Sequence, residues 1–421
     1  MMGLYFFTTL HIYIYVGGKK MKILKIILAL TLSVLLLCES VCAVTVSSEC
    51  DISDVAVPID STVTDAAIGT KLDIKAKSAI LMEVNTGKIL YEQNADEKLP
   101  PASITKIMSL LLVMEAIKSG KMSVEDVISA SEHACSMGGS QIWLEPGEAM
   151  TVDDLLKAAV IASANDATVA LGEHIAGSEE GFVSMMNARA AELGMTNTYF
   201  ENATGLDAEG HLSSAHDVAI MSSALIKHEL IKKYSTVWMD TLRDGESELV
   251  NTNKLVRFYE GTTGLKTGTT SSAGYCLSAT AERNGLELVA VIMSGDSSQE
   301  RFNGAKKLLD YGFANYEYIN LKPTLEQNEL PIKNGVEKSV TITALNDFGA
   351  LLKKSESSSV EQRVTLNENL TAPVEKGEVV GAVDFYLGDQ QIGSVDITAT
   401  KKVDKKNFLT AFLWILHGLI Q

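Results

Sequence analysis

Segments with the pattern of β-strands lie near residue 80 and again from residue 264, and helical patterns fill the interval. Residues 78–84 and 88–91 flank an Asn-Thr-Gly turn, which predicts a β-hairpin. Residues 265–269, 274–281 and 286–293 are three further candidate strands. Strands far apart in sequence share one sheet when the intervening helices cover its faces. We therefore expect an α/β (or α+β) sandwich in which the first and last strands belong to one sheet.

Helical signals fill the segment between these strands. The candidate helices are residues 104–117, 155–161, 179–193 and 299–313. Ser103 stands at the start of the first, Thr151 predicts an N-cap before the second, and Gly194 ends the third. The fourth helix follows the last strand, so we assign residues 73–319 to one domain.

Past residue 320 the pattern changes to short alternating runs separated by turn residues. Residues 340–343, 379–383 and 395–397 are the clearest of these runs. Short strands between turn signals are typical of small all-β domains. We therefore expect a second, β-rich domain over residues 320–400.

The first 43 residues have the three parts of an export signal. Four lysines precede an apolar stretch over residues 26–37, and Val-Cys-Ala at residues 41–43 fits a cleavage site. A polar linker over residues 44–72 is expected to open the mature chain. Met21 already begins a complete signal, so we expect translation to start there. An uncleaved membrane anchor is the alternative.

The last segment, residues 401–421, is a candidate membrane-anchoring helix. Its final 15 residues place polar side chains on one side and apolar side chains on the rest. This length is too short to cross a bilayer, which takes about 20 residues. Four lysines precede it, as in amphipathic helices that lie in the interface of an anionic membrane. A helix docked on the β-rich domain is the alternative.

Charge and cysteine content argue against several classes of function. The formal net charge of −17 disfavours nucleic acid as a partner, because a surface of that sign repels phosphates. Two of the five cysteines, Cys38 and Cys42, fall in the export signal. The others, Cys50, Cys135 and Cys276, have no CxxC or Cys/His spacing, so we expect neither a disulfide framework nor a metal site.

Three short motifs carry residues suited to chemistry. They are Ser103-Ile104-Thr105-Lys106, Ser163-Ala164-Asn165 and Lys266-Thr267-Gly268. On a helix the spacing of the first motif places a hydroxyl and an amine on one face. Each motif alone is a weak signal. Together and in this order they are the motif set of penicillin-binding proteins and class A β-lactamases.

With these motifs the chain resembles the low-molecular-weight penicillin-binding proteins that are D-Ala-D-Ala carboxypeptidases, peptidase family S11. The matching stretches are residues 99–106, 163–167, 205–206, 210–211, 214–217, 251–255 and 263–268. The resemblance implies the penicillin-binding, β-lactamase-like transpeptidase fold, followed by a small all-β C-terminal domain and an amphipathic C-terminal helix.

The resemblance also implies a function. The protein is expected to remove the terminal D-Ala from peptidoglycan stem peptides through an acyl-enzyme, and to be inhibited covalently by β-lactam antibiotics such as penicillin. No cofactor is expected. The place of action is expected to be the outer face of the bacterial cytoplasmic membrane.

The residues themselves suggest how the serine is activated. A serine hydroxyl is a poor nucleophile until a base takes its proton, and no His-Asp pair is placed to do so. Lys106 is the nearest candidate base to Ser103. It can act only if burial and a second cation, such as Lys266, lower its pKa.

Other candidate site residues follow from the remaining motifs. Ser163 is expected to relay the proton toward the leaving amine, and Asn165 to hold a substrate amide or carbonyl. By resemblance, Lys266 and Thr267 meet the terminal carboxylate. Gly268 is expected to let the substrate strand approach the sheet edge closely.

Two further elements complete the expected site. The oxyanion is expected to rest on the backbone N–H groups of Ser103 and Thr269. Arg301 matches a family arginine near the carboxylate site. A surface arginine on a helix is the alternative.

Some positions in the matching stretches are expected to be structural. His211, His216 and Asp217 are expected to cap and hydrogen bond the start of a helix from Ser214. Ala203 stands where the family usually has Pro, and we expect this departure to affect a turn and not the chemistry.

Two alternatives compete with this function. A class A β-lactamase needs a carboxylate to activate the deacylating water, but Ala164 stands where those enzymes have Asp. No Glu-x-x-Leu-Asn segment lies between Ser163 and Lys266 either, so deacylation of penicillin is expected to be slow. A non-catalytic, penicillin-binding wall sensor has no need for the nucleophile and base that the chain retains.

Overall fold

The computed structural model describes residues 15–16, 19–20 and 72–407. Most of the expected export signal and linker, and the tail from residue 408, lie outside the described residues, so the expectations for those segments stay predictions. Of the residues described before residue 72, β1 (Tyr15–Val16) pairs with β2 (Lys19–Lys20).

A five-stranded antiparallel sheet forms the centre of the helical domain. Its strands, in spatial order, are β4 (Ile89–Gln93), β3 (Ala76–Glu83), β11 (Leu286–Gly295), β10 (Gly274–Arg283) and β9 (Thr262–Thr270). The N-terminal hairpin and the three later strands therefore share one sheet, as the sequence predicts. β9 lies at an edge of this sheet.

Both faces of the sheet are buried, because successive side chains of its central strands enter two different cores. On β11, Val289 and Val291 join the first core, while Leu288 and Ala290 join the second. A strand that is buried on both faces needs a continuous apolar run. β11 agrees with this requirement, because all ten of its residues are buried and most of them are apolar.

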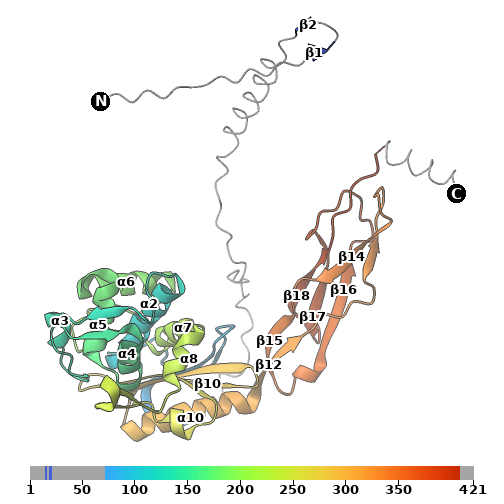
Figure 1. Ribbon diagram of the computed structural model, residues 1–421. Helices are drawn as coiled ribbons and strands as arrows, with labels where there is room; N and C mark the ends of the chain where they lie inside the picture. The colour runs from blue at the N-terminus through green and yellow to red at the C-terminus, as the bar shows by residue number, and fades with distance from the viewer. Residues whose placement is uncertain (1–14, 17–18, 21–71, 408–421) are drawn as a thin grey trace. The chain divides into compact units, whose positions relative to one another are not determined.

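Helices cover the two faces unequally (Figure 1). The first core receives side chains from α2 (Lys106–Lys118), α3 (Glu132–Cys135), α4 (Val152–Lys157), α5 (Asn165–Ala176), α6 (Glu179–Glu192), α7 (Ala215–Ile226) and α8 (Glu229–Ser235). On the other face, α10 (Ser298–Asn315) contributes Ala305, Leu308 and Leu309 to the second core. The result is a three-layer arrangement of helices, sheet and helix.

Smaller elements connect these layers. They are the hairpin of β5 (Val127–Ser129) and β6 (Ala149–Thr151), the hairpin of β7 (Met239–Leu242) and β8 (Ser247–Val250), the 3-10 turn Arg243–Gly245 and the helix α9 (Leu255–Phe258). The cysteines Cys135 and Cys276 are free thiols.

The expected helix-end signals at Thr151 and Gly194 are confirmed, but two helices have other bounds than predicted. The helix expected over residues 155–161 is α4, which begins at Val152 and ends at Lys157, before a π-helical turn over residues 158–162. Thr151 Oγ1 accepts the N–H of Asp154 at 3.1 Å, and Gly194, with φ of 75°, follows α6. The first helix, however, begins at Lys106 and not at residue 104. The preceding residues, Ala102–Thr105, form a 3-10 turn, and the left-handed φ of 49° at Ala102 separates this turn from the extended chain before it.

The C-terminal domain is all β, as expected (Figure 1). Its strands are β13 (Glu329–Pro331), β14 (Ser339–Ala344), β18 (Gln390–Ala399), β17 (Val379–Leu387) and β16 (Val360–Leu366), in spatial order, and the 3-10 turn Ser357–Ser359 precedes β16. β12 (Tyr316–Leu321) pairs with β15 (Phe348–Lys353). The boundary expected after residue 319 therefore falls inside β12.

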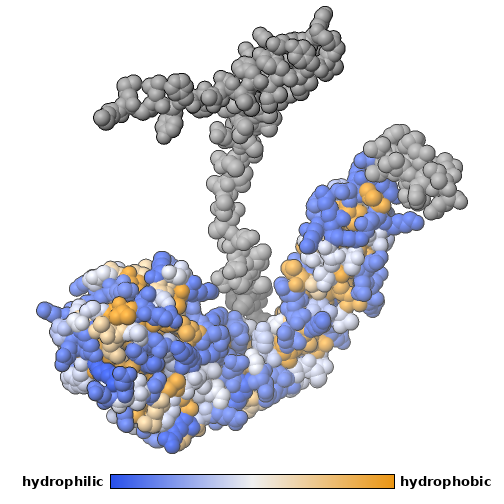
Figure 2. Space-filling view, in the orientation of Figure 1, coloured by the Kyte–Doolittle hydropathy of each residue, from blue (hydrophilic) through white to orange (hydrophobic). Residues whose placement is uncertain are grey.

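Polar and apolar side chains alternate over the visible surface of these two domains (Figure 2). Large apolar side chains that are exposed include Trp143, Phe258 and Val336. Of the helices in the described residues, none combines the length and the apolar character that a membrane span requires.

Candidate active site

Ser103 lies in a turn that is otherwise buried. The turn Ala102–Thr105 leads directly into α2. Among residues 101–110, Ser103 alone is only partly buried. A reagent from solvent can therefore reach this hydroxyl while the backbone around it stays fixed by packing.

Two glycines allow neighbouring segments to contact the turn Ala102–Thr105, called the serine turn below. Gly205 has φ of 85°, and a Cβ at this position would overlap the carbonyl oxygen of Ala102. A Cβ on Gly268 would lie 2.9 Å from the carbonyl oxygen of Pro101 and 3.1 Å from the amide nitrogen of Ile104. Gly268 is thus required by the packing of β9 on the serine turn, and its expected role in substrate approach stays a prediction.

Lys106 presents its amine to the serine from inside the domain. Its Nζ lies 3.1 Å from Ser103 Oγ and donates a hydrogen bond of 2.8 Å to the backbone carbonyl of Thr204. The side chain is fully buried. Burial first, and the charge of Lys266 second, hold the pKa of Lys106 well below its usual value, although Asp166 acts in the opposite direction.

Lys266 is the second buried amine, and it comes from β9. Its side chain is 1% exposed, and its Nζ donates to the carbonyl oxygen of Thr267 at 3.1 Å. Burial and the charge of Arg301 lower the pKa of Lys266 to about 7. In the described part of the chain, neither Lys106 nor Lys266 forms an ion pair with a carboxylate.

Ser163 and Asn165 lie where a distorted helix turns into α5. The residues Ala158–Ala162 form a π-helical turn, and Ser163 has a left-handed φ of 63°. Such distortions are concentrated at functional sites. Asn165 opens α5, and its Nδ2 donates to the carbonyl of Gly138 at 2.6 Å. Its Oδ1 is buried and has no partner among the described residues.

Arg301 is buried beneath β9. Its guanidinium Nη1 donates to the carbonyl of Gly268 at 3.0 Å, to Thr269 Oγ1 at 2.9 Å and to the carbonyl of Cys276 at 3.2 Å. The residue is 8% exposed, so the alternative of a surface arginine is wrong. A fixed cation behind the edge strand favours the neutral form of Lys266.

The structure joins the predicted site residues in separate hydrogen-bonded groups. Ser103 is joined to Lys106, and Gly268 and Thr269 are joined to Arg301. No hydrogen bond joins the Ser163 hydroxyl to Ser103 or Lys106 in the described chain.

Sequence reasoning missed three contributors to the site. Thr204 supplies the carbonyl that binds Lys106, and Thr252 accepts the hydroxyl of Thr267 at 2.8 Å. Asp166 binds the backbone N–H groups of Ile142 and Leu144, each at 3.1 Å, and so fixes the loop before β6. All three lie in or beside stretches that match the family, but a backbone carbonyl leaves no side-chain signal in a sequence.

The predicted structural role of His211 needs a correction. Ser214 does cap α7, because its Oγ accepts the Asp217 N–H at 3.1 Å, whereas the Asp217 carboxylate accepts from the Asn197 N–H and the Thr198 hydroxyl at 2.8 Å each. His211 acts elsewhere: its Nε2 lies 2.7 Å from Thr105 Oγ1 in the serine turn, and its Nδ1 accepts the N–H of Glu201 at 3.0 Å. An accepting Nδ1 requires the neutral ring, whose Nε2–H then donates to Thr105.

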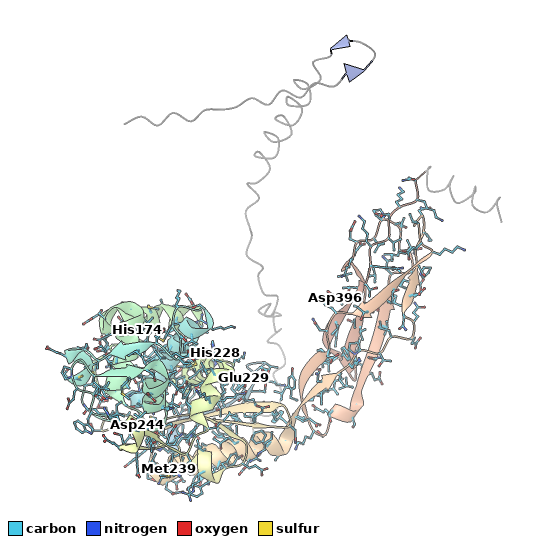
Figure 3. All side chains as sticks on the ribbon, in the orientation of Figure 1. His174, His228, Glu229, Met239, Asp244 and Asp396 are labelled. Carbon is cyan, nitrogen blue, oxygen red and sulfur yellow. The ribbon has the colours of Figure 1, made fainter. Side chains whose placement is uncertain are left out.

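Other histidines lie away from these contacts. His174 is on α5 and His228 precedes α8, both in the helical part of the domain (Figure 3). Among the described residues, no group of three or more His, Cys, Asp or Glu side chains is arranged to hold a metal ion.

The fold and the serine–lysine pair together define a class of protein, the serine hydrolases of the penicillin-binding type. The comparisons agree with this class. The family described as D-alanyl-D-alanine carboxypeptidase matches residues 63–297, and the family described as penicillin-binding protein 5, C-terminal domain, matches residues 321–405.

Individual relatives cover both domains. D-alanyl-D-alanine carboxypeptidase DacF of Bacillus subtilis is 43% identical over 81% of this chain and 89% of its own length. DacC of Escherichia coli is 35% identical over 80% of this chain and 86% of its own. Penicillin binding protein 5 of Haemophilus influenzae has a similar structure, with a TM-score of 0.68, 34% identity, and coverage of 80% of this chain and 99% of that chain.

A shorter relative matches the first domain. Penicillin-binding protein D2 of Listeria monocytogenes, in the ampicillin-bound form, has a TM-score of 0.53 and 33% identity, and covers 58% of this chain and 100% of that chain. On these matches the chain belongs to the D-alanyl-D-alanine carboxypeptidase family.

His211 predicts a pH dependence of stability. Burial lowers its pKa from the ordinary 6.5 to about 4, so the unfolded chain binds a proton at a higher pH than the folded protein does. This contribution to the free energy of unfolding is complete above pH 6.5 and is lost as the pH falls toward 4. A shift of this size corresponds to about 3 kcal/mol. The free energy of unfolding of the parent and of His211→Gln, measured by chemical denaturation at pH 7 and pH 4.5, tests this contribution. The prediction fails if the difference between the two proteins does not change with pH.

Proposed function

We propose that this protein removes the terminal D-Ala from peptidoglycan stem peptides through an acyl-enzyme on Ser103. One observation carries the proposal: the Lys106 amine lies 3.1 Å from Ser103 Oγ, in a buried place where its pKa is lowered. A neutral amine can take the proton of a neighbouring hydroxyl and so activate that hydroxyl as a nucleophile.

The acylation step uses the residues of the first two motifs. Lys106 takes the proton of Ser103, and the freed Oγ attacks the carbonyl carbon of the penultimate D-Ala. The oxyanion rests on the backbone N–H groups of Ser103 and Thr269. The C–N bond then breaks, the proton reaches the departing amine of D-Ala through Ser163, and water later releases the shortened peptide.

The terminal carboxylate of the substrate provides the specificity. Lys266 and Thr267 bind it at the edge of the sheet, and its negative charge favours the protonated form of Lys266. Arg301 adds a second positive charge from beneath β9. The unpartnered Oδ1 of Asn165 is an acceptor suited to a substrate amide N–H.

A β-lactam ring is expected to acylate the same serine and to leave slowly. The likeness to a relative solved in its ampicillin-bound form supports this expectation. The β-lactamase alternative predicts rapid release, so the lifetime of the penicilloyl-enzyme separates the two.

Export and attachment complete the proposal. The chain acts outside the cytoplasmic membrane after its signal, residues 1–43, is removed. Residues 73–319 form the catalytic domain, residues 320–400 the β-rich domain, and residues 401–421 bind the membrane surface.

The nucleophile predicts the outcome of a direct assay. A protein spanning residues 44–400 should release free D-alanine from a peptide ending in Lys-D-Ala-D-Ala. Its Ser103→Ala variant should release D-alanine at least 1000-fold more slowly, because it has no group to form the acyl-enzyme. Coupled detection of D-alanine measures both rates. Equal rates in a folded pair, or no release by the folded parent, would count against the carboxypeptidase and leave the wall sensor.

The base predicts a second outcome. Lys106→Arg keeps the positive charge but cannot give up a proton in a protein, so acylation by a fluorescent penicillin should fall by about 1000-fold or more. Lys121→Arg, a change on an exposed lysine outside the site, serves as the control. Near-normal acylation in Lys106→Arg would rule out Lys106 as the base.

The tail predicts a change of fraction. Truncation after Thr400 removes the four lysines and the apolar face that are expected to bind anionic lipid. The shortened protein should move from the membrane fraction to the soluble exported fraction, as measured by immunoblotting of separated fractions. If the shortened protein stays with the membranes, attachment must come from another segment.

A further inference from the structure

The orientation of the Lys106 amine depends on a backbone carbonyl. Among the described residues, its hydrogen-bonding neighbours are Ser103 Oγ at 3.1 Å and the Thr204 carbonyl oxygen at 2.8 Å. A neutral amine has two N–H groups and one lone pair. When one N–H points at the Thr204 oxygen, the lone pair can face the serine hydroxyl. The place of this carbonyl therefore sets the direction of the base.

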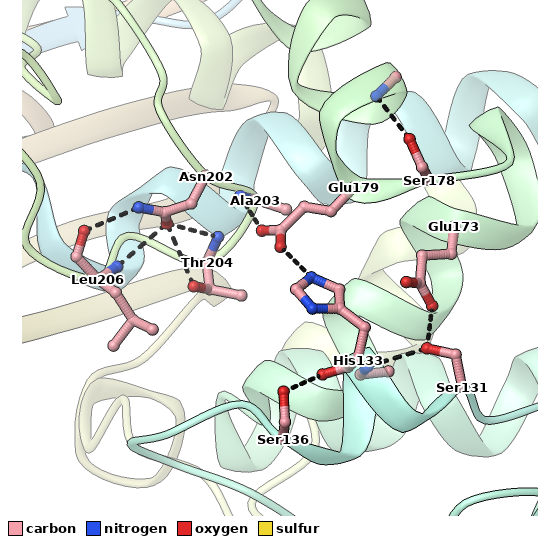
Figure 4. Close-up of polar contacts among 12 residues, drawn as sticks. Ser131, His133, Ser136, Glu173, Ser178, Glu179, Asn202, Ala203, Thr204 and Leu206 are labelled. Atoms are coloured by element: carbon pink, nitrogen blue, oxygen red, sulfur yellow. Dashed lines mark hydrogen bonds and ion pairs between the residues drawn. The ribbon is translucent and has the colours of Figure 1, made fainter.

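In the loop that carries the Thr204 carbonyl, one side chain of the described residues, that of Asn202, accepts the backbone N–H groups of three successive residues. Its Oδ1 accepts the N–H of Gly205 at 2.7 Å, the N–H groups of Thr204 and Leu206 at 3.2 Å each, and the Thr204 hydroxyl at 3.2 Å. Its Nδ2 donates to the Leu206 carbonyl at 2.9 Å. Figure 4 shows the amide among these partners. The loop contains no helix or strand that could fix these groups instead.

A separate set of contacts holds the preceding residue. Glu179, at the start of α6, accepts the Ala203 N–H at 2.9 Å and lies 2.7 Å from His133 Nε2 (Figure 4). Ser109 Oγ, on α2, donates to the Ala203 carbonyl at 2.6 Å. Residue 203 is thus attached to two helices, whereas the peptide groups from Thr204 onward depend on Asn202.

We propose that Asn202 is a positioning residue for the base: it fixes the Thr204 carbonyl and thereby aims the Lys106 amine at Ser103. The inference rests on the proposed function, in which Lys106 takes the serine proton. Asn202 itself touches neither Ser103 nor Lys106 through a hydrogen bond in the described chain.

The consequence for catalysis is specific to the chemical step. Without the Asn202 side chain, three backbone N–H groups and one hydroxyl lose their acceptor, and the loop must move to find others. A displacement of about 1 Å at a reacting group can cost on the order of 100-fold in rate. The groups expected to bind the substrate carboxylate, Lys266, Thr267 and Arg301, make no hydrogen bond to Asn202. Initial binding should therefore be preserved.

The test uses a graded set of variants and a matched control. Asn202→Ala removes the acceptor, while Asn202→Asp keeps an oxygen in the place of Oδ1, loses the donor to Leu206 and adds a negative charge. Asn187→Ala is the control, because Asn187 binds the N–H and the carbonyl of Phe200 at 2.8 Å each, just before the same loop. This variant also removes hydrogen bonds from an asparagine side chain to the backbone, but none of them involves the peptide groups of Thr204.

Stopped-flow acylation by a fluorescent penicillin separates the dissociation constant of the first complex from the acylation rate constant. We expect Asn202→Ala to lower the acylation rate constant by about 100-fold and to change the dissociation constant by no more than about threefold. Asn187→Ala should acylate within about threefold of the parent, and Asn202→Asp, measured as a function of pH because its charge acts on Lys106, should retain more of the acylation rate than Asn202→Ala. The proposal is overturned if Asn202→Ala acylates as fast as the parent, or if Asn187→Ala loses as much.

Two further measurements keep the outcomes distinct. Acylation by Lys106→Arg is measured in the same experiment. Normal acylation by Lys106→Arg would contradict the proposed role of Lys106 as the base. Loss of acylation in Lys106→Arg together with full acylation in Asn202→Ala would contradict only the positioning role of Asn202. If circular dichroism shows that Asn202→Ala is unfolded, Asn202→Leu replaces it, since leucine has nearly the shape of asparagine and no acceptor. A folded Asn202→Leu with reduced acylation supports the proposal, and one with the parent rate overturns it.

Discussion

The burial of two amines is the constraint on which the site depends. An ammonium group without a carboxylate partner is costly in a protein interior, and the cost falls when the group gives up its proton. Lys106 and Lys266 are both buried in this way, and the charge of Lys266 lowers the pKa of Lys106 further, as the charge of Arg301 lowers that of Lys266. Burial thus favours the neutral form of Lys106, the form that can take the proton of a serine.

The surrounding structure keeps the two amines buried and the backbone around them fixed. Gly205 and Gly268 bring backbone directly against the serine turn, with no side chain between. His211 holds the turn through Thr105, and the neutral state of its ring adds no charge near the amines. The polar contacts nearest the reaction therefore come largely from backbone groups, which cannot rotate away as side chains do.

Much of this arrangement could be predicted from the sequence. The alternating strands, the caps such as Thr151 and the three motifs are local signals, and the structure confirms the sheet that joins the ends of the domain. The start of α2 was misplaced because the left-handed Ala102 and the 3-10 turn leave no mark in residue type. The Thr204 carbonyl and the burial of Arg301 could not be predicted, since they arise from contacts between segments far apart in the chain.

The edge position of β9 has a consequence for substrate choice. Within the described chain one side of this strand pairs with β10, and no strand pairs with the other side. An extended peptide can join the sheet there as an additional strand, whereas a helical or tightly folded segment cannot match the spacing of the strand's N–H and C=O groups. Under the proposed function, the edge position of β9 therefore favours an extended peptide over a folded segment as the substrate.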